Sequence, residues 1–179
     1  QNCLFIIDEA YYMFGCDSGI DLIKDFENVV VTRTFSKGFG VPSIRLGYLI
    51  SNEDNMSVLS KTRLAHESNS LTNAVAEYLL DNYDSIVKPY NERVISSRDS
   101  LKNILHALDI PTHGKNGNYL LLDMKDVNRA KKFVDFLKNK ERYVKGPWSG
   151  SRDKYITITI GPEELMERFV VATKEFLAK

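Results

Sequence analysis

The chain has 179 residues, of which 24 are Lys or Arg and 24 are Asp or Glu, so its formal net charge is zero. This balance argues against a general nucleic-acid-binding protein, whose surface carries a strong basic excess. No run of about 18 apolar residues is present, which argues against a membrane span. Two cysteines are too few for a disulfide framework, which favours a reducing compartment such as the cytoplasm. The length suits one large domain or two small ones.

Three short apolar segments in the first fifty residues predict strands that are buried on both faces. They lie at 4–7, 29–32 and 46–50, and none of them alternates between apolar and polar residues. Between them lie segments that suit helices or loops, a rhythm typical of an α/β fold with a mostly parallel sheet. The chain does not begin with Met and opens directly before the first strand, so we expect it to be the C-terminal part of a longer protein.

Helical spacing of apolar residues follows from about 68 to 108, and Pro89 is expected to mark a break or kink there. A turn is expected between Pro111 and Gly117. A second, smaller α/β unit is predicted after that turn. Its expected elements are a strand over 119–122, a helix over 128–140, a short strand over 142–145, a strand over 155–160 and a C-terminal helix with Pro162 at its first position.

A lysine stands between hydroxyl and glycine residues just after the second predicted strand. Lys37 follows Ser36 and precedes Gly38 in the segment 34–40, whose sequence is Thr-Phe-Ser-Lys-Gly-Phe-Gly. Small neighbours let a ligand approach the backbone closely, and a lysine amine in a partly dry site is a nucleophile for carbonyl groups. Taken alone, such a lysine is more often an exposed loop residue. Other functional groups must therefore accompany it before a site is indicated.

Three further residues supply such groups. Asp8 ends the first predicted strand, where α/β folds bind ligands, although a turn or helix-capping aspartate gives the same pattern. Tyr11 adds a phenol and Arg45 a guanidinium, and each alone fits a half-buried aromatic or a surface ion pair. With Lys37 they match the needs of pyridoxal phosphate: an amine for a Schiff base, a carboxylate for the pyridine nitrogen, a phenol for the ring hydroxyl, and a guanidinium that holds the phosphate together with the Ser36 hydroxyl.

Three motifs resemble those of the fold-type I pyridoxal-phosphate aminotransferases. They are Asp-Glu-Ala-Tyr over 8–11, Arg-Thr-Phe-Ser-Lys-Gly-Phe-Gly over 33–40 and Ile-Arg-Leu-Gly-Tyr over 44–48. The separations of 29 residues from Asp8 to Lys37 and of 8 residues from Lys37 to Arg45 fit the family pattern. The chain is most similar to the class I/II branch that contains histidinol-phosphate aminotransferase and threonine-phosphate decarboxylase.

The resemblance implies a fold and a set of site residues. Residues 1–88 would be the C-terminal portion of the large, mostly parallel cofactor-binding domain with its connecting helix, and residues 89–179 the small C-terminal α/β domain. Lys37 is the implied catalytic residue. The implied cofactor-binding residues are Asp8, Tyr11, Thr34, Ser36, Lys37 and Arg45.

The resemblance also implies partners. The protein would be a cytoplasmic, biosynthetic homodimer that uses a small amino donor and a keto acceptor, without nucleic acid, membrane or metal. In this family the N-terminal half supplies a phosphate-binding loop and an aromatic residue that stacks on the cofactor ring. We therefore expect the chain alone to be inactive.

Two positions depart from the family pattern. Thr157 stands where the family usually has an arginine that grips the substrate carboxylate, and Arg152 is a nearby candidate replacement. Ala65-His66-Glu67 stands where relatives often have Pro-aromatic-Asn, and His66 is more simply interpreted as a surface histidine. These departures do not change the expected cofactor, but they leave the identity of the substrate undetermined.

Three hypotheses follow. The first is an aminotransferase that acts through a Lys37 Schiff base on a small substrate, with or without a phosphate group. The second keeps the cofactor but cleaves a different bond, as a decarboxylase or lyase of the threonine-phosphate decarboxylase type. The third is an inactive domain with a dimerisation role. Retention of Lys37, Asp8, Tyr11 and Arg45 together argues against the third.

Overall fold

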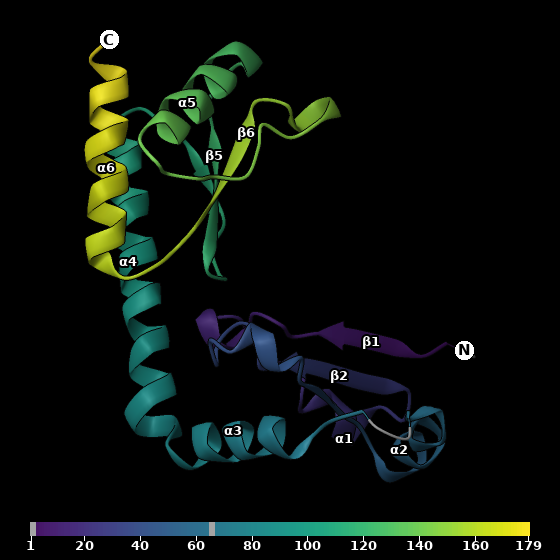
Figure 1. Ribbon diagram of the computed structural model, residues 1–179. Coiled ribbons are helices and arrows are strands. Elements are labelled where there is room, and N and C mark those ends of the chain that lie inside the picture. Colours follow the sequence, from purple (N-terminus) through teal and green to yellow (C-terminus); the bar gives the residue numbers. More distant parts are fainter. Residues whose placement is uncertain (1–2, 65–66) are drawn as a thin grey trace. The chain divides into compact units, whose positions relative to one another are not determined.

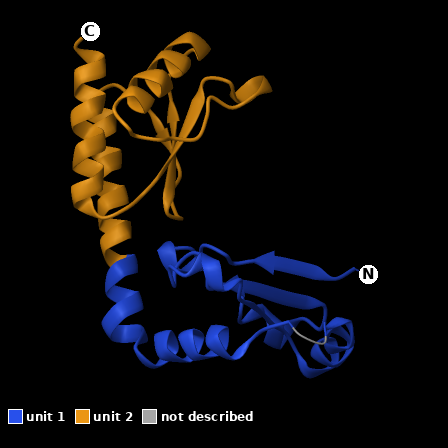
Figure 2. Ribbon diagram, in the orientation of Figure 1, with its two compact units in different colours: residues 1–91 blue, residues 92–179 orange. Residues whose placement is uncertain are grey.

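The computed structural model describes residues 3–64 and 67–179, so His66 lies outside the described residues. The chain divides into two compact units, residues 1–91 and residues 92–179 (Figure 2). Helix α4 (Lys88–Ala107) contributes residues to both units. Within the two described ranges, no helix is both long and apolar enough to cross a membrane.

Unit 1 contains a three-stranded sheet in the order β1 (Phe5–Asp8), β2 (Val29–Thr34) and β3 (Gly47–Ile50) (Figure 1). β1 and β2 run parallel, whereas β3 runs antiparallel to β2. The three successive valines at the start of β2 are all buried, as expected for a strand with a neighbour on each side and cover on its faces. Glycine is required at the start of β3, because a Cβ at Gly47 would lie 2.9 Å from the carbonyl oxygen of Arg33.

Asparagine side chains begin two helices of unit 1. Asn52 precedes α2 (Glu53–Leu59) and Asn69 precedes α3 (Ser70–Asp81), and each side-chain oxygen accepts the N–H three residues later at 2.9 Å. These bonds satisfy donors that would otherwise be unpaired in the first turn. The remaining short elements are α1 (Leu22–Asp25) and three 3₁₀ turns at Tyr12–Phe14, Pro42–Ile44 and Ser60–Thr62.

A π-helical turn at Tyr83–Val87 joins α3 to α4, and Pro89 is the second residue of α4. The predicted irregularity at the proline therefore takes the form of a change of helix type just before it. A proline is tolerated at this point because the first N–H groups of a helix have no acceptor within it.

Unit 2 contains a second sheet, antiparallel throughout, in the order β4 (Thr112–His113), β5 (Tyr119–Asp123) and β6 (Tyr155–Thr159). Alternate residues of β5 and β6 are buried, and helices α5 (Val127–Asn139) and α6 (Glu163–Leu177) contribute Phe133 and Phe169, whose rings lie 6.1 Å apart. The Asp126 side chain caps α5 by accepting two backbone N–H groups. This unit thus has its own apolar core.

Three local predictions for unit 2 differ from the structure in their details. The segment 142–145 forms only one bridge, between Lys145 and Thr157, because Glu141 adopts a left-handed φ of 59° before it and Pro147, which has no N–H, follows soon after. Pro162 lies at the N-cap position, one residue before the first helical residue of α6, and not at the first helical position. The predicted turn between Pro111 and Gly117 begins later than expected, because Thr112 and His113 form the two-residue strand β4, which is too short to show a periodic pattern, while Gly114 and Gly117 both have positive φ in the turn that follows.

Candidate active site

A tight loop connects β2 to the 3₁₀ turn before β3, and Lys37 lies at its exposed tip. The Phe35 N–H donates to the Leu46 carbonyl at 3.0 Å, and the Val41 N–H donates to the Phe35 carbonyl at 3.2 Å. Within the loop, the Gly40 N–H donates to the Lys37 carbonyl at 2.9 Å, and Gly40 adopts a φ of 73° that favours glycine. Backbone bonds therefore fix the direction in which the Lys37 side chain leaves the loop.

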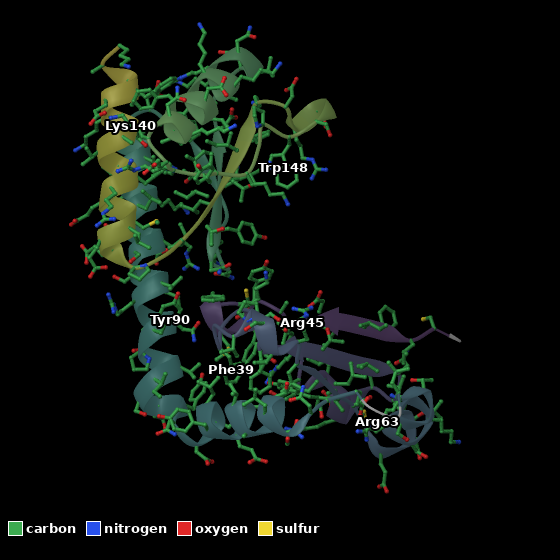
Figure 3. The ribbon with its side chains drawn as sticks, in the orientation of Figure 1. Phe39, Arg45, Arg63, Tyr90, Lys140 and Trp148 are labelled. Carbon is green, nitrogen blue, oxygen red and sulfur yellow. The ribbon has the colours of Figure 1, made fainter. Side chains whose placement is uncertain are left out.

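Two phenylalanines anchor this loop on either side of Lys37. Phe35 and Phe39 stack with ring centroids 4.2 Å apart, and both are buried in one apolar cluster with Ala76 and Leu79 of α3 and with Val87. Phe39 is labelled in Figure 3, where it lies within unit 1. The two buried rings thus anchor the loop on both sides of the exposed Lys37.

Gly38 and Asn91 fix the residue that follows the lysine. A Cβ at Gly38 would lie 2.8 Å from the Cβ of Met13, so only glycine fits there. The buried Asn91 side chain donates from Nδ2 to the Gly38 carbonyl at 2.9 Å and to the Val87 carbonyl at 2.8 Å. Helix α4 therefore holds the lysine loop through a single amide group.

We expect Asn91→Ala to lower the free energy of unfolding of unit 1 by about 2 kcal/mol, because the buried Gly38 carbonyl loses its donor. Urea denaturation of the wild-type protein and of the variant measures the difference in the free energy of unfolding. Asn103→Ala is the matched control, since Asn103 is an exposed asparagine of the same helix. An equal loss of stability in both variants would contradict the assigned role.

Of the residues predicted to form the site, Tyr11 lies beside Lys37 in the structure. The Lys37 amine lies 5.4 Å from the centroid of the Tyr11 ring, in the segment that follows β1. Across residues 3–64 and 67–179, Lys37 forms no salt bridge. Its amine is therefore available to a ligand that approaches over the Tyr11 ring.

Asp8 lies at the carboxyl end of β1 with its side chain exposed. Its Oδ1 accepts the Ala10 N–H at 3.0 Å, so the carboxylate also shapes the turn that leads to Tyr11. The register pairs Asp8 with Thr32 of β2, two residues before Thr34. The turn role and the ligand role considered from the sequence are therefore compatible, because one hydrogen bond leaves most of the carboxylate's acceptor capacity unused.

Thr34 and Ser36 differ in what their hydroxyl groups do. The Thr34 Oγ1 accepts the Ser36 N–H at 3.0 Å and donates to the Leu46 carbonyl at 3.4 Å, so this hydroxyl is committed to the loop. The Ser36 hydroxyl forms no hydrogen bond with any described residue. Ser36 is therefore the better phosphate-binding candidate of the two.

Arg45 occupies a left-handed conformation with a φ of 54° at the end of the 3₁₀ turn. Its side chain is exposed and donates from Nη1 to the Pro42 carbonyl at 2.8 Å (Figure 3). In the described part of the chain no carboxylate pairs with it, and no hydrogen bond joins it to Ser36 or Lys37. The guanidinium thus keeps most of its donors for an anion.

Two residues beside the predicted site were missed by the sequence analysis. Glu9, which follows Asp8, is only 5% exposed, and Arg33, which precedes Thr34, forms an ion pair with it at 2.9 Å. Strand alternation was the available signal, because two successive acidic residues at a strand end must point to opposite sides.

Thr157, one of the two positions that depart from the family pattern, lies in β6 of unit 2. The Thr157 Oγ1 accepts the indole N–H of Trp148 at 3.1 Å. The Lys145 amine lies 4.6 Å from the centroid of the Trp148 ring, and the guanidinium carbon of Arg152 lies 6.0 Å from it. Trp148 is labelled in Figure 3. The threonine hydroxyl therefore orients an indole that two cations contact.

No group of three or more His, Cys, Asp or Glu residues in the described part of the chain is arranged to hold a metal ion. His106 contacts the Thr112 hydroxyl at 3.0 Å, and His113 packs its ring against Tyr155. These two histidines thus have structural contacts.

Comparison with known proteins identifies the family. A family model described as "Aminotransferase class I and II" matches residues 1–172. The chain belongs to this family. Among curated aminotransferases it is similar to the histidinol-phosphate aminotransferases of Pyrococcus furiosus, at 34% identity over 96% of this chain and 47% of the relative, and of Thermotoga neapolitana, at 32% identity over 98% and 50%. The chain spans about half the length of these relatives.

Solved aminotransferase structures share the fold. The histidinol-phosphate aminotransferase from Sinorhizobium meliloti, in complex with pyridoxal-5'-phosphate, matches with a TM-score of 0.84 at 24% identity, over 98% of this chain and 49% of that chain. The α/β fold predicted for a portion of a class I/II aminotransferase is thereby confirmed.

Proposed function

We propose that the protein to which this chain belongs is a pyridoxal-phosphate-dependent aminotransferase of the histidinol-phosphate aminotransferase type. The arrangement of Lys37 and Tyr11 carries the proposal, because an amine that pairs with no described carboxylate lies over an aromatic ring, on a loop held by backbone hydrogen bonds. Family membership and relatives named histidinol-phosphate aminotransferase support it.

The donor groups of unit 1 fit pyridoxal phosphate. Lys37 offers an unpaired amine, and Asp8 offers a carboxylate at the end of β1 for a protonated ring nitrogen. Ser36 and Arg45 offer an unused hydroxyl and a guanidinium without a carboxylate partner for the phosphate. Tyr11 offers a ring beside the amine. Thr34 acts indirectly, because its hydroxyl accepts the Ser36 N–H and so holds the loop that carries Ser36 and Lys37. When bound, the cofactor supplies an electron sink for bonds at the substrate's α-carbon.

Each residue then has a task of its own. The Lys37 amine holds the cofactor and afterwards accepts and returns a proton at Nζ. The Asp8 carboxylate stabilises the positive charge on the ring nitrogen, and the Arg45 guanidinium balances the phosphate. The Gly40 bond to the Lys37 carbonyl keeps the backbone in place while the lysine side chain moves.

The substrates, assembly and location are part of the same proposal. We propose a small amino donor and a keto acceptor, of which one has a phosphate group, as the names of the relatives indicate. Residues 1–88 would belong to a large cofactor-binding domain and residues 89–179 to a small domain. The protein would act as a homodimer in the cytoplasm.

The test uses the complete protein, purified and loaded with pyridoxal phosphate. Glutamate is added, and the visible absorbance of the bound cofactor is followed until it converts to the pyridoxamine form. Conversion is the expected result, because a transaminase returns its cofactor in the amine form after the first half-reaction. Histidinol phosphate is added in a parallel experiment as the second donor.

Two other outcomes would contradict the proposal. Release of carbon dioxide from a phosphorylated amino acid, with no conversion by either donor, would identify the decarboxylase reaction instead. Failure of the wild-type protein to retain pyridoxal phosphate would remove every reaction of this cofactor. Lys61→Ala serves as a control, because Lys61 is an exposed lysine of the same unit outside the site.

A further inference from the structure

The function proposed above assigns no role to the ion pair between Glu9 and Arg33. The Glu9 carboxylate is almost fully buried, with 4% of its side chain exposed, and Arg33 is 13% exposed. Both Nε and Nη2 of Arg33 approach the same oxygen, Oε2, at 2.9 Å. The other oxygen, Oε1, accepts the Ser18 hydroxyl at 2.9 Å and the Gly19 N–H. All of these donors converge on one carboxylate.

The register of β1 and β2 places this ion pair on the face of the strands opposite to Asp8 and Thr34, two of the candidate cofactor residues. Asp8 is paired with Thr32, so Asp8, Thr32 and Thr34 share one side of the strands. Glu9 and Arg33 are the next residues along and meet on the opposite side. Any rotation of either strand end that separated the ion pair would also turn Asp8 or Thr34.

Tyr12 extends the same network toward Tyr11. The guanidinium carbon of Arg33 lies 3.9 Å from the centroid of the Tyr12 ring, a close cation–π contact. Burial, together with a hydrogen bond to Tyr48, raises the pKa of Tyr12 to about 12. The hydrogen bond to Tyr48 and the contact with the Arg33 guanidinium hold the Tyr12 ring from two sides. Tyr11 is the preceding residue, and its ring lies beside the Lys37 amine.

We infer that Glu9 and Arg33 are positioning residues that set the direction of Asp8 and Tyr11 toward the cofactor and fix Thr34, which holds the loop of Lys37. Each of these three residues is a direct chain neighbour of Glu9, Tyr12 or Arg33. Nε and Nη2 of Arg33, the Ser18 hydroxyl and the Gly19 N–H all meet on one buried carboxylate, and such directional bonds restrict the geometry of the two strand ends more than apolar contacts do. This inference rests on the proposed function, since it concerns residues of the same site.

The test compares variants of the complete protein loaded with pyridoxal phosphate. Glu9→Gln removes the charge at nearly constant volume, and Arg33→Lys keeps the charge but loses the forked pair of donors. We expect both to weaken cofactor binding about 10- to 100-fold and to change the circular dichroism of the bound cofactor in its visible band. Fluorescence titration gives the affinity. Thermal unfolding without cofactor gives the stability separately.

Asp21→Asn is the matched control, because it removes an exposed ion pair with Lys24, at 2.8 Å, in the same unit. We expect the control to leave both the cofactor affinity and the circular dichroism unchanged. If Glu9→Gln does not fold, Tyr12→Leu provides a milder test, since it strips the ring from Arg33 and leaves the carboxylate paired. It is expected to change the same dichroism band by a smaller amount.

Folded Glu9→Gln and Arg33→Lys variants with wild-type affinity and an unchanged dichroism band would overturn the inference, even if their melting temperatures fell. That result would assign the pair to folding stability alone. Failure of the proposed function looks different, because the wild-type protein itself would then show no bound cofactor.

Discussion

Replacing Lys37 with alanine is expected to abolish the visible absorbance band of the lysine-bound cofactor and to lower the transamination rate at least about 10³-fold. In the proposed function the lysine amine both attaches the cofactor and moves the proton, so one substitution would remove two tasks. Its side chain is exposed and forms no salt bridge with a described carboxylate, so the fold should tolerate the change. Absorbance spectra and steady-state rates of the complete protein measure the effect.

Two comparisons make this result interpretable. Lys61→Ala removes an exposed lysine elsewhere in unit 1 and should keep both the band and the rate. Lys37→Arg keeps a positive charge at the tip of the loop but cannot form a Schiff base, so it should be as inactive as Lys37→Ala. Full activity of Lys37→Ala would exclude the proposed chemistry, because the proposal places the attachment of the cofactor at the Lys37 amine.

The sequence predicted the strands of unit 1 well because their signal is local and strong. The runs at 4–7, 29–32 and 46–50 all overlap observed strands, but the predicted burial on both faces holds only for the valines of β2. Phe5 and Ile6 of β1 are exposed, and β3 alternates between exposed and half-buried residues, because an apolar run predicts a strand and does not show what covers its faces. The direction of β3 could not be read in the same way, because strand direction depends on the path of the intervening loop. The loop at 35–41 is tight, and it returns β3 antiparallel to β2.

The short elements of unit 2 were harder to predict. The segment 142–145 has the composition of a strand, yet a left-handed Glu141 and the following proline limit it to one bridge. β4 has two residues, too few to show any period. Both cases depend on partners distant in the sequence, which a local pattern does not contain.

The candidate site was predicted as a set of groups, and the structure adds how each group is supported. The chemistry of an amine, a carboxylate, a phenol and a guanidinium is readable from Lys37, Asp8, Tyr11 and Arg45 themselves. The supports are not readable, because Asn91 acts on Gly38 across 53 residues and Arg33 acts on Glu9 across 24. Such contacts exist only once the chain has folded.

Asp8→Asn is expected to lower kcat about 10²- to 10³-fold in the complete protein, with little loss of stability. In the wild-type protein the Asp8 carboxylate accepts the Ala10 N–H at 3.0 Å. An asparagine oxygen can accept the same N–H, so the turn that leads to Tyr11 is kept. What the variant loses is the negative charge that stabilises a protonated ring nitrogen. Steady-state kinetics and thermal unfolding, measured on the same samples, separate the two effects.

Asp17→Asn provides the control, because Asp17 is an exposed carboxylate of the same unit and should change neither quantity. Asp8→Ala removes the turn bond as well as the charge, so it should lose stability that Asp8→Asn retains. If Asp8→Asn kept the full rate while Asp8→Ala lost stability, Asp8 would be a turn residue and no more. A large fall in kcat for Asp8→Asn with an unchanged melting temperature would instead place the charge of this carboxylate in the chemistry, because the turn it shapes is the same in both proteins.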